Sequence, residues 1–313
     1  MKTIYFGCDE FSQKILEQIL KENLLEIVMV ISAPDKPQKR GLKILPTPVK
    51  KFAQENNLKV LTPSSLDEEF YKKIKDKDID LILVVGYGKR IPPFFLNSAK
   101  LNLGIHPSLL PQYRGAAPIE RALLEGEEET GVTIFKLTEE IDAGPIALQE
   151  KVRIDFEDDY FTLFSKLTLK AFKALKEVVS FIKEDKISFS PQKGEVSYAP
   201  KIKKEEAEID WHLPAERIYN LIRAFKKWPV AYTFYKKKRI RIFEAEVIEK
   251  DTEFFPSQII GWDKEGIEVA TGKGIIKIKK LQPEGKRIME GISFVCGYRV
   301  MKGDKFEGRS QNA

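Results

Sequence analysis

The sequence predicts an α/β protein: a doubly wound, mostly parallel, Rossmann-like sheet in the first half, and a small β-barrel of the oligonucleotide-binding type in the second. Three observations carry this prediction. Uniformly apolar runs alternate with helix-like segments through the first 136 residues, which is typical of parallel strands buried on both faces. After residue 229 the pattern changes to short, evenly spaced β-like runs. A Ser-, Pro- and Gly-containing stretch without a sustained period separates the two parts.

The length of 313 residues favours two domains. We expect a first domain at residues 1–187, a linker at 188–204 and a second domain at 205–313. No apolar run is as long as a membrane span, and the N-terminus opens on a strand pattern instead of a signal peptide. The two cysteines lie at opposite ends of the chain. We therefore expect a cytoplasmic protein without a disulfide framework.

The elements of the first domain follow from the period of the apolar residues. Strands are expected at residues 3–7, 26–31, 58–61, 79–85, 101–105 and 132–136. Helices are expected at residues 11–20, 49–56, 68–77, 119–124 and 160–183. In sheets of this kind ligands bind beyond the carboxyl ends of the strands. The turns after Phe6, Ile31, Val85 and Ile105 therefore mark the expected ligand-binding edge.

The second domain is expected to begin with a helix within 205–224, with Pro214 near its start. Strands should follow at 231–235, 239–247, 258–261, 266–270, 274–280 and 297–300. Residues 201–313 carry 24 Lys and Arg against 17 Asp and Glu, whereas the rest of the chain is nearly neutral. This charge favours a polyanionic partner, nucleic acid before membrane, with a solvated Lys- and Glu-rich surface as the alternative.

Two further features limit the possible functions. The turn after Gly7 lacks the later glycines of a dinucleotide fingerprint, and no Walker sequence occurs, so NAD-dependent and phosphoryl-transfer chemistry are not favoured. Residues 34–43 form a polar loop punctuated by Pro and Gly that contains four cations: Lys36, Lys39, Arg40 and Lys43. This loop is either an ordinary surface loop or a clamp for phosphate groups.

An imidazole and a carboxylate each follow an apolar run in the central stretch. His106 ends the run 101–105 and precedes Pro107, and Asp142 lies in a turn after 132–136 that ends at Gly144. Imidazole is the side chain best suited to proton transfer near neutral pH, and a carboxylate can orient it or relay the proton. No serine stands in a nucleophile elbow, and the second histidine, His212, is remote in the sequence, so no metal site is expected.

Short motifs are spread over nearly the whole chain: Asp35-Lys36-Pro37, Gly86-Tyr87-Gly88, His106-Pro107-Ser108-Leu109-Leu110-Pro111, Arg114-Gly115-Ala116-Ala117-Pro118, Asp142-Ala143-Gly144, Tyr198-Ala199-Pro200-Lys201-Ile202, Trp228-Pro229 and Leu281-Gln282-Pro283-Glu284-Gly285-Lys286. Together they resemble the methionyl-tRNA formyltransferases. The Ser-Leu-Leu-Pro segment with its preceding His marks the wider folate-dependent formyltransferase class. The C-terminal motifs narrow the resemblance to the enzymes that act on tRNA.

The resemblance implies transfer of the formyl group of 10-formyltetrahydrofolate to the amino group of initiator methionyl-tRNA. It places His106 and Asp142 on the catalytic His and Asp of the family. It places Ser108, Leu109, Leu110 and Pro111 on the family's folate-binding segment and Arg40 on the basic residue of its tRNA-contacting loop. We also expect Tyr87 and Gly88 to contact the folate, and Lys36, Lys39 and Lys43 to contact tRNA. We expect no metal cofactor, no membrane partner and a monomer.

One departure from the family pattern bears on catalysis. The family has an Asn two positions before the His, which hydrogen-bonds the formyl oxygen, and this chain has Gly104 there. Losing such a donor costs about 10²–10³ in rate. Asn102 would replace it if a bulge at Gly104 shifted the strand; a water or a backbone N–H is the alternative. Two other functions therefore stay open: formyl transfer to a small amine, and tRNA binding with impaired catalysis.

Overall fold

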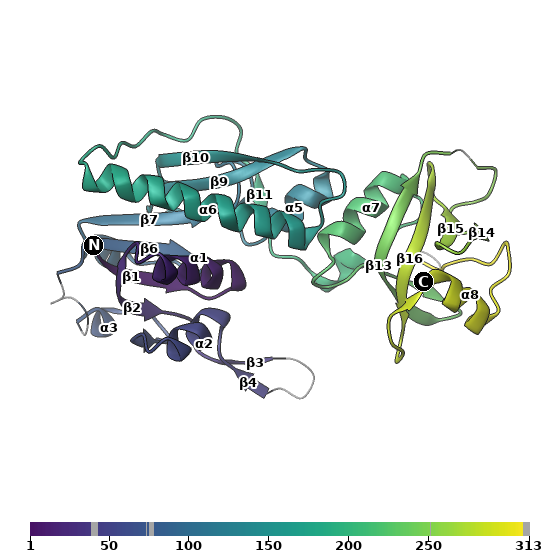
Figure 1. Cartoon of the computed structure of the whole chain (residues 1–313), viewed down its shortest axis with the longest axis horizontal. Helices are drawn as coiled ribbons and strands as arrows, with labels where there is room; N and C mark the ends of the chain where they lie inside the picture. The colour runs from purple at the N-terminus through teal and green to yellow at the C-terminus, as the bar shows by residue number, and fades with distance from the viewer. Residues whose placement is uncertain (39–42, 73, 75–77, 251, 309–313) are drawn as a thin grey trace. The chain divides into compact units, whose positions relative to one another are not determined.

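The computed structural model describes residues 1–38, 43–72, 74, 78–250 and 252–308. The chain divides into two compact units, whose elements are labelled in Figure 1. Unit 1 comprises Met1–Pro118, Glu129–Arg153 and Phe164–Pro200, and unit 2 comprises Ile119–Glu128, Ile154–Leu163 and Lys201–Ala313. Ile119–Glu128 and Ile154–Leu163 therefore belong to the same compact unit as the C-terminal part of the chain.

Unit 1 is built on a seven-stranded sheet in the order β10-β9-β7-β6-β1-β2-β5. The strands are β1 (Lys2–Gly7), β2 (Glu26–Ile31), β5 (Val60–Leu61), β6 (Leu81–Val85), β7 (Leu101–His106), β9 (Glu129–Lys136) and β10 (Ile146–Arg153). The five strands from β5 to β7 pair in parallel, which confirms the predicted α/β class. β9 is antiparallel to both β7 and β10. An apolar run does not encode strand direction, and β10, whose exposure alternates, was not predicted.

Helices cover both faces of this sheet. The helices of unit 1 are α1 (Glu10–Lys21), α2 (Pro48–Glu55), α3 (Glu68–Lys72), α4 (Pro93–Leu96) and α6 (Tyr160–Lys183) from Phe164 onward, whereas α5 (Pro118–Glu125) belongs to unit 2 from Ile119. On one face the Tyr5 hydroxyl donates to the Ser12 carbonyl of α1, and Phe11 of α1 packs edge-on against Phe164 of α6. On the other face Phe6 packs against Phe95 of α4. Burial on both faces explains why the strands are apolar throughout.

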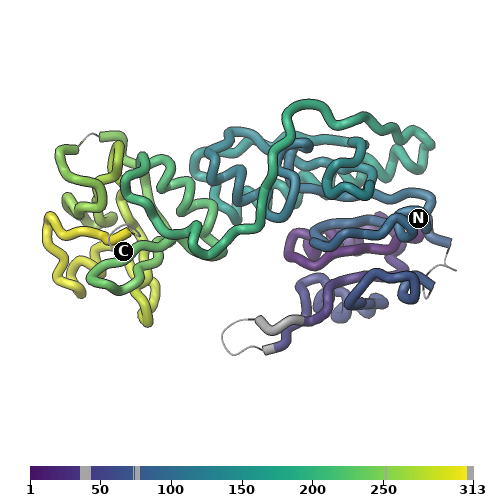
Figure 2. Tube along the Cα trace, turned by 180° about the vertical axis from the view of Figure 1, so that it is seen from behind, coloured from purple at the N-terminus to yellow at the C-terminus, as the bar shows by residue number. Residues whose placement is uncertain are grey.

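Two small pairings complete unit 1. The hairpin of β3 (Lys36–Gln38) and β4 (Lys43–Leu45) extends from the sheet (Figure 1). β8 (Arg114–Gly115) pairs in parallel with β11 (Tyr198–Ala199), and Ser190 bridges to Ile146. Figure 2 shows the stretch after α6 running back over unit 1. Of the stretch 188–204 that the sequence suggested as a linker, residues 188–200 belong to this unit and 201–204 to unit 2.

Unit 2 contains an antiparallel sheet in the order β12-β13-β16-β15-β14. Its elements are η1 (Lys204–Ala207), α7 (Ala215–Ala224), β12 (Tyr232–Tyr235), β13 (Lys238–Ile248), β14 (Ile259–Trp262), β15 (Ile267–Ala270), β16 (Ile275–Pro283), β17 (Met289–Glu290) and α8 (Gly291–Tyr298). The inward-facing aliphatic side chains of these strands surround Trp211, Tyr235 and Phe294. The predicted small β domain is confirmed, and its strands pair antiparallel.

One prediction for unit 2 is wrong and another is confirmed. The strand expected at 297–300 is wrong, because α8 continues to Tyr298 and ends at Arg299 in the left-handed conformation. Its apolar run buries Phe294 and Val295 on one helical face, and such short runs fit a helix as well as a strand. The helix expected within 205–224, with Pro214 near its start, is confirmed as α7, whose N-cap is Pro214; the separate 3-10 turn η1 precedes it.

The segment 304–307 closes the sheet of unit 2 by bridging to both of its edges. Glu307 exchanges backbone hydrogen bonds with Phe234 of β12, and the Phe306 N–H donates to the Ser257 carbonyl beside β14. Phe306 is fully buried and stacks on Trp211 at 5.6 Å. Across the described residues of both units, no helix combines the length and the apolar character that a membrane crossing requires.

Candidate active site

The candidate site lies where β6 and β7 end. Because the two strands pair in parallel, their carboxyl ends meet at one edge of the sheet. The turn Gly86–Gly88 follows β6, and His106 is the last residue of β7. The Cys8 thiol, just after β1, donates to the Tyr87 carbonyl at 3.5 Å, which places a third strand end at the same edge. Burial raises the pKa of Cys8.

The structure brings His106 and Asp142 together. Nδ1 of the imidazole lies 3.7 Å from Oδ2 of Asp142, and the two side chains are only 8% and 16% exposed. Nε2 of His106 lies 2.8 Å from the Tyr113 carbonyl. Because a carbonyl can only accept a hydrogen bond, Nε2 carries the hydrogen in the neutral ring, and Nδ1 presents a lone pair toward the carboxylate side.

Asp142 sits in a tight turn between β9 and β10. Its backbone is in the left-handed region, with φ of 55°, and the Gly115 N–H donates to Oδ2 at 2.9 Å. A Cβ at Gly144 would lie 1.7 Å from the Lys136 carbonyl oxygen, so only glycine allows the backbone at 144 to pass this close to Lys136. The turn therefore fixes where the carboxylate stands relative to His106.

The loop 108–111 is held by side chains that face into the protein. Ser108 is fully buried and its hydroxyl donates to the Gln112 carbonyl at 2.6 Å, and the Leu110–Pro111 peptide bond is cis. The Thr133 hydroxyl of β9 donates to the Ser108 carbonyl and accepts from the Leu110 N–H. These bonds give the loop one backbone shape beside His106.

The turn that follows β6 leaves open space at Gly88. A Cβ at Gly88, where φ is +67°, would meet no atom within 4 Å. Tyr87 is buried against Phe6, burial raises its pKa, and its hydroxyl has no hydrogen-bond partner in the part of the chain that is described. The turn thus combines a buried phenol with an unobstructed glycine backbone.

Asn102 does not reach the His106–Asp142 pair. It lies four residues before His106 on β7, about 13 Å away at strand spacing, and its Nδ2 donates to the Leu96 carbonyl. β7 pairs with β6 without a bulge through Gly104. The ring of Phe135 and the side chain of Leu137 fill the space where a side chain at 104 would stand, with the Phe135 ring 2.7 Å from the ideal Cβ.

The basic loop is described only in part. Lys36 and Lys43 lie at the ends of the β3–β4 hairpin, whereas Lys39 and Arg40 lie outside the described residues. The structure therefore places the hairpin but not these two cations.

Sequence reasoning missed the side chains that support the pair and the loop. Gln149 of β10 donates to the Leu110 carbonyl, Gln192 donates to the Asp142 carbonyl, and the Ser197 hydroxyl accepts from the Tyr113 N–H. A polar residue inside a strand, such as Thr133, was a usable signal. Gln192 and Ser197 gave none, because they stand in a stretch without a period.

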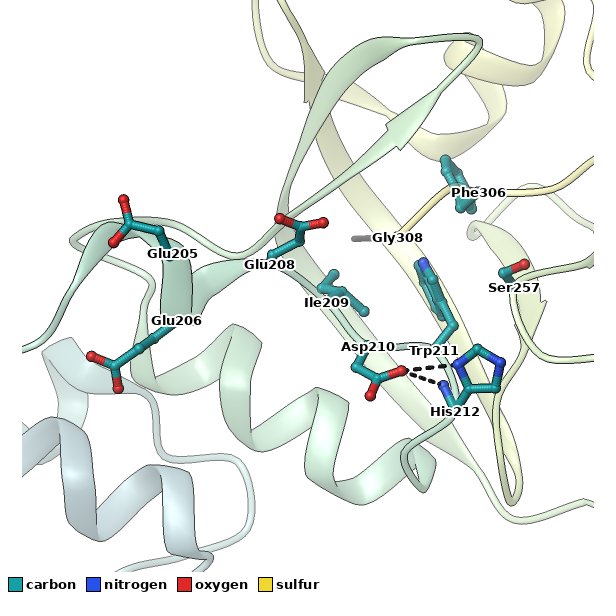
Figure 3. A pocket seen from close by; sticks show the side chains of 10 residues that line it. All are labelled: Glu205, Glu206, Glu208, Ile209, Asp210, Trp211, His212, Ser257, Phe306 and Gly308. Carbon is teal, nitrogen blue, oxygen red and sulfur yellow. Dashed lines mark hydrogen bonds and ion pairs between the residues drawn. The ribbon is translucent and has the colours of Figure 1, made fainter. Parts of the chain in front are cut away.

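A separate pocket of about 510 Å³ lies in unit 2 (Figure 3). Its lining includes four acidic residues, and Asp210 accepts from both the backbone N–H and the ring of His212. None of the sequence-predicted site residues lines it. The acidic lining is unsuited to phosphate or to the carboxylates of a folate. Within the described ranges, no three or more His, Cys, Asp or Glu side chains are grouped to hold a metal ion.

Both halves of the chain match known protein families. Residues 1–179 match the family described as formyl transferase, and residues 201–299 match the formyl transferase C-terminal domain. A methionyl-tRNA formyltransferase of Dictyoglomus thermophilum is 43% identical over 98% of this chain and 100% of its own length. One from Caldicellulosiruptor saccharolyticus is 40% identical over 97% and 99%.

Solved structures with lower identity share the fold. An N-formyltransferase from Helicobacter canadensis, solved with folinic acid and dTDP-3-aminofucose, has a TM-score of 0.64 at 21% identity, covering 89% of this chain and 99% of its own. HypX from Aquifex aeolicus, solved with tetrahydrofolic acid, has a TM-score of 0.62 at 17% identity, covering 99% and 51%.

Proposed function

This chain belongs to the formyl transferase family, and from that premise we propose that it transfers the formyl group of 10-formyltetrahydrofolate to the amino group of initiator methionyl-tRNA. The observation that carries the proposal is the full-length similarity to methionyl-tRNA formyltransferases, which extends through the C-terminal domain. It is supported by the His106–Asp142 pair at the ligand-binding edge of the sheet.

The proposed folate site is the space between the 108–111 loop and the turn after β6. The open backbone at Gly88 leaves room for a flat ring, and half-buried Leu109 with buried Leu110 supplies an apolar neighbour. The Thr133 hydroxyl fixes the backbone of this loop through Ser108 and Leu110, so binding a flat ring beside it orders little further chain. The residues therefore fit the donor that the family uses.

In the proposed mechanism the methionyl amine attacks the formyl carbon, and the bond from that carbon to the folate nitrogen N10 breaks. Nδ1 of His106 accepts a proton from the attacking amine, because Nε2 already donates to Tyr113. The Asp142 carboxylate, 3.7 Å away, stabilises the imidazolium that forms. The proton then passes to N10 as it leaves. General base catalysis of this kind contributes about 10²–10⁴ in rate.

We assign tRNA binding to the basic residues of the second half of the chain and to the cations of the loop: Lys36, Lys39, Arg40 and Lys43. Lys and Arg bind the phosphate backbone and release counterions, so binding should weaken steeply with salt. The enzyme would act as a monomer in the cytoplasm, where initiator tRNA is charged.

The test is formylation of methionyl-tRNA by the variants His106→Ala and Asp142→Asn. We expect losses of about 10²–10⁴ in kcat for each. The second histidine provides a matched control: His212 lies 3.0 Å from Asp210 but is 67% exposed, so His212→Ala should keep full activity. Near wild-type rates in both site variants would overturn the proposal.

The same assay separates the alternatives. A tRNA-binding protein with impaired catalysis would bind tRNA in a salt-dependent way without forming product. An enzyme for small amines would formylate an amino sugar or a glycinamide faster than methionyl-tRNA.

A further inference from the structure

We propose that Gln192 is a positioning residue that holds Asp142 in its working place beside His106. This inference rests on the proposed function, because it takes the His106–Asp142 pair to be catalytic. Gln192 lies outside residues 1–179 that match the formyl transferase family, in the stretch that the sequence suggested as a linker.

One amide group of Gln192 braces the turn that carries Asp142. Its Nε2 donates to the Asp142 carbonyl at 2.8 Å and to the Gly144 carbonyl at 2.9 Å. Both carbonyls belong to a turn that has a positive φ at Asp142, a conformation that residues other than glycine adopt only at a steric cost. The brace acts where the local backbone alone is least favourable.

The oxygen of the Gln192 amide holds Arg114, which precedes the residue that donates to the Asp142 carboxylate. Oε1 of Gln192 accepts from Nη2 of Arg114 at 2.7 Å, and Nη1 of Arg114 pairs with Glu140 at 3.0 Å. The next residue, Gly115, donates its N–H to Oδ2 of Asp142. Gln192 therefore ties together the turn that carries the carboxylate and the strand that donates to it.

The neighbouring residues of the same stretch hold the imidazole. The Tyr113 N–H donates to the Ser197 hydroxyl at 2.9 Å, and the Arg114 N–H donates to the Ser197 carbonyl at 3.0 Å. Tyr113 in turn supplies the carbonyl that accepts from Nε2 of His106. Residues 192–197 thus support both members of the pair from behind.

This geometry predicts a kinetic effect and not merely a structural one. The 3.7 Å separation between Nδ1 and Oδ2 must shorten to about 2.7–2.9 Å for a charge-assisted hydrogen bond to the imidazolium. A displacement of about 1 Å at such a contact can cost about 10²-fold in rate. Loss of the brace should therefore lower kcat and leave the binding of both substrates nearly unchanged.

The experiment compares Gln192→Met, which keeps the length of the side chain, with Gln192→Glu, which keeps the acceptor for Arg114 but cannot donate to the two carbonyls. We expect kcat to fall about 10- to 100-fold in both, with the KM values for formyltetrahydrofolate and tRNA within about twofold of wild type. Gln149→Met is the contrasting variant, because Gln149 holds the 108–111 loop and should change the folate KM instead.

A spectroscopic readout separates positioning from general damage. The chain has two histidines, so the imidazole nitrogen spectrum resolves His106 against His212 as an internal reference. In both Gln192 variants the His106 signals should move while those of His212 stay. If Gln192→Met does not fold, as judged by thermal melting, Gln192→Glu decides.

The outcomes distinguish the two proposals. Suppose that His106→Ala is inactive, but the folded Gln192 variants keep the wild-type kcat and an unmoved His106 spectrum. This result would overturn the positioning role of Gln192 and leave the proposed function standing. Equal rises in both KM values without a fall in kcat would also overturn it. An active His106→Ala would overturn the proposed function itself.

Discussion

Replacing Gly104 by alanine tests whether Phe135 has taken the place of the side chain that the family carries there. The ideal Cβ would lie 2.7 Å from two carbons of the Phe135 ring and 2.9 Å from a methyl of Leu137. Carbon atoms prefer about 3.5–4.0 Å, so the ring must move by roughly 1 Å within a packed strand pair. Overpacking of this kind costs about 1–3 kcal/mol.

The lower entropy of the unfolded chain in the alanine variant partly offsets this cost to the free energy of unfolding. Alanine lowers the entropy of the unfolded chain relative to glycine, which stabilises by about 0.4–1 kcal/mol where φ is ordinary. We therefore expect Gly104→Ala to lower the free energy of unfolding by about 1–2 kcal/mol. Gly261→Ala is the matched control, because Gly261 also lies on a strand and its Cβ would meet only Glu268 at 3.8 Å.

The assay is urea unfolding of a double-mutant cycle. Phe135→Ala alone should lower the free energy of unfolding by about 3–5 kcal/mol. Gly104→Asn should lower it less in the Phe135→Ala background than in the wild-type background. The difference between the two backgrounds, the coupling energy, should be about 0.5–3 kcal/mol. If the asparagine then faces the formyl group, the double variant should formylate faster than Phe135→Ala alone. The idea that the Phe135 ring fills the place of an Asn side chain at position 104 would be refuted by either of two results. One is wild-type stability of Gly104→Ala, and the other is additivity of the Phe135→Ala and Gly104→Asn effects within about 0.5 kcal/mol.

Three other predictions use separate contacts. Thr133→Val removes the hydroxyl that accepts from the Leu110 N–H, so the 108–111 loop loses a bond that fixes it. In steady-state assays the folate KM should rise about tenfold while kcat is largely kept. An unchanged KM would contradict the assignment of this loop to folate binding. Burial opposes ionisation of Asp304, but the Tyr235 hydroxyl lowers its pKa below the usual range. The resulting stability is present above about pH 4 and lost as pH falls through the lowered pKa, so urea midpoints should fall less on acidification in Tyr235→Phe than in wild type. Arg40→Ala should weaken tRNA use and leave folate affinity unchanged; equal losses for both substrates would argue against a tRNA-contacting loop.

The sequence predicted the elements whose physical signal is local. Uniformly apolar runs identified the buried strands, and the position of His106 at the end of one of them placed it at the ligand-binding edge. The turn at Asp142-Ala143-Gly144 indicated a second strand end. Since both features depend on neighbouring residues alone, sequence reasoning could find them.

The features that sequence reasoning missed depend on contacts between distant residues. Gln192 acts through hydrogen bonds to Asp142 and Arg114, 50 and 78 positions away, and no local period marks it. The direction of β9 depends on which strand it pairs with, not on its composition. At Gly104 the relevant neighbour is Phe135, which only the strand register brings opposite.

The parallel pairing of β8 with β11 has a consequence for how the protein is made. During synthesis His106 and Asp142 are added dozens of residues before Ser197 and Ala199. At about 5–20 residues per second, the nascent polypeptide spends several seconds with its reactive groups present but unbraced. Translation must therefore proceed past β11 before a newborn molecule can work at its full rate.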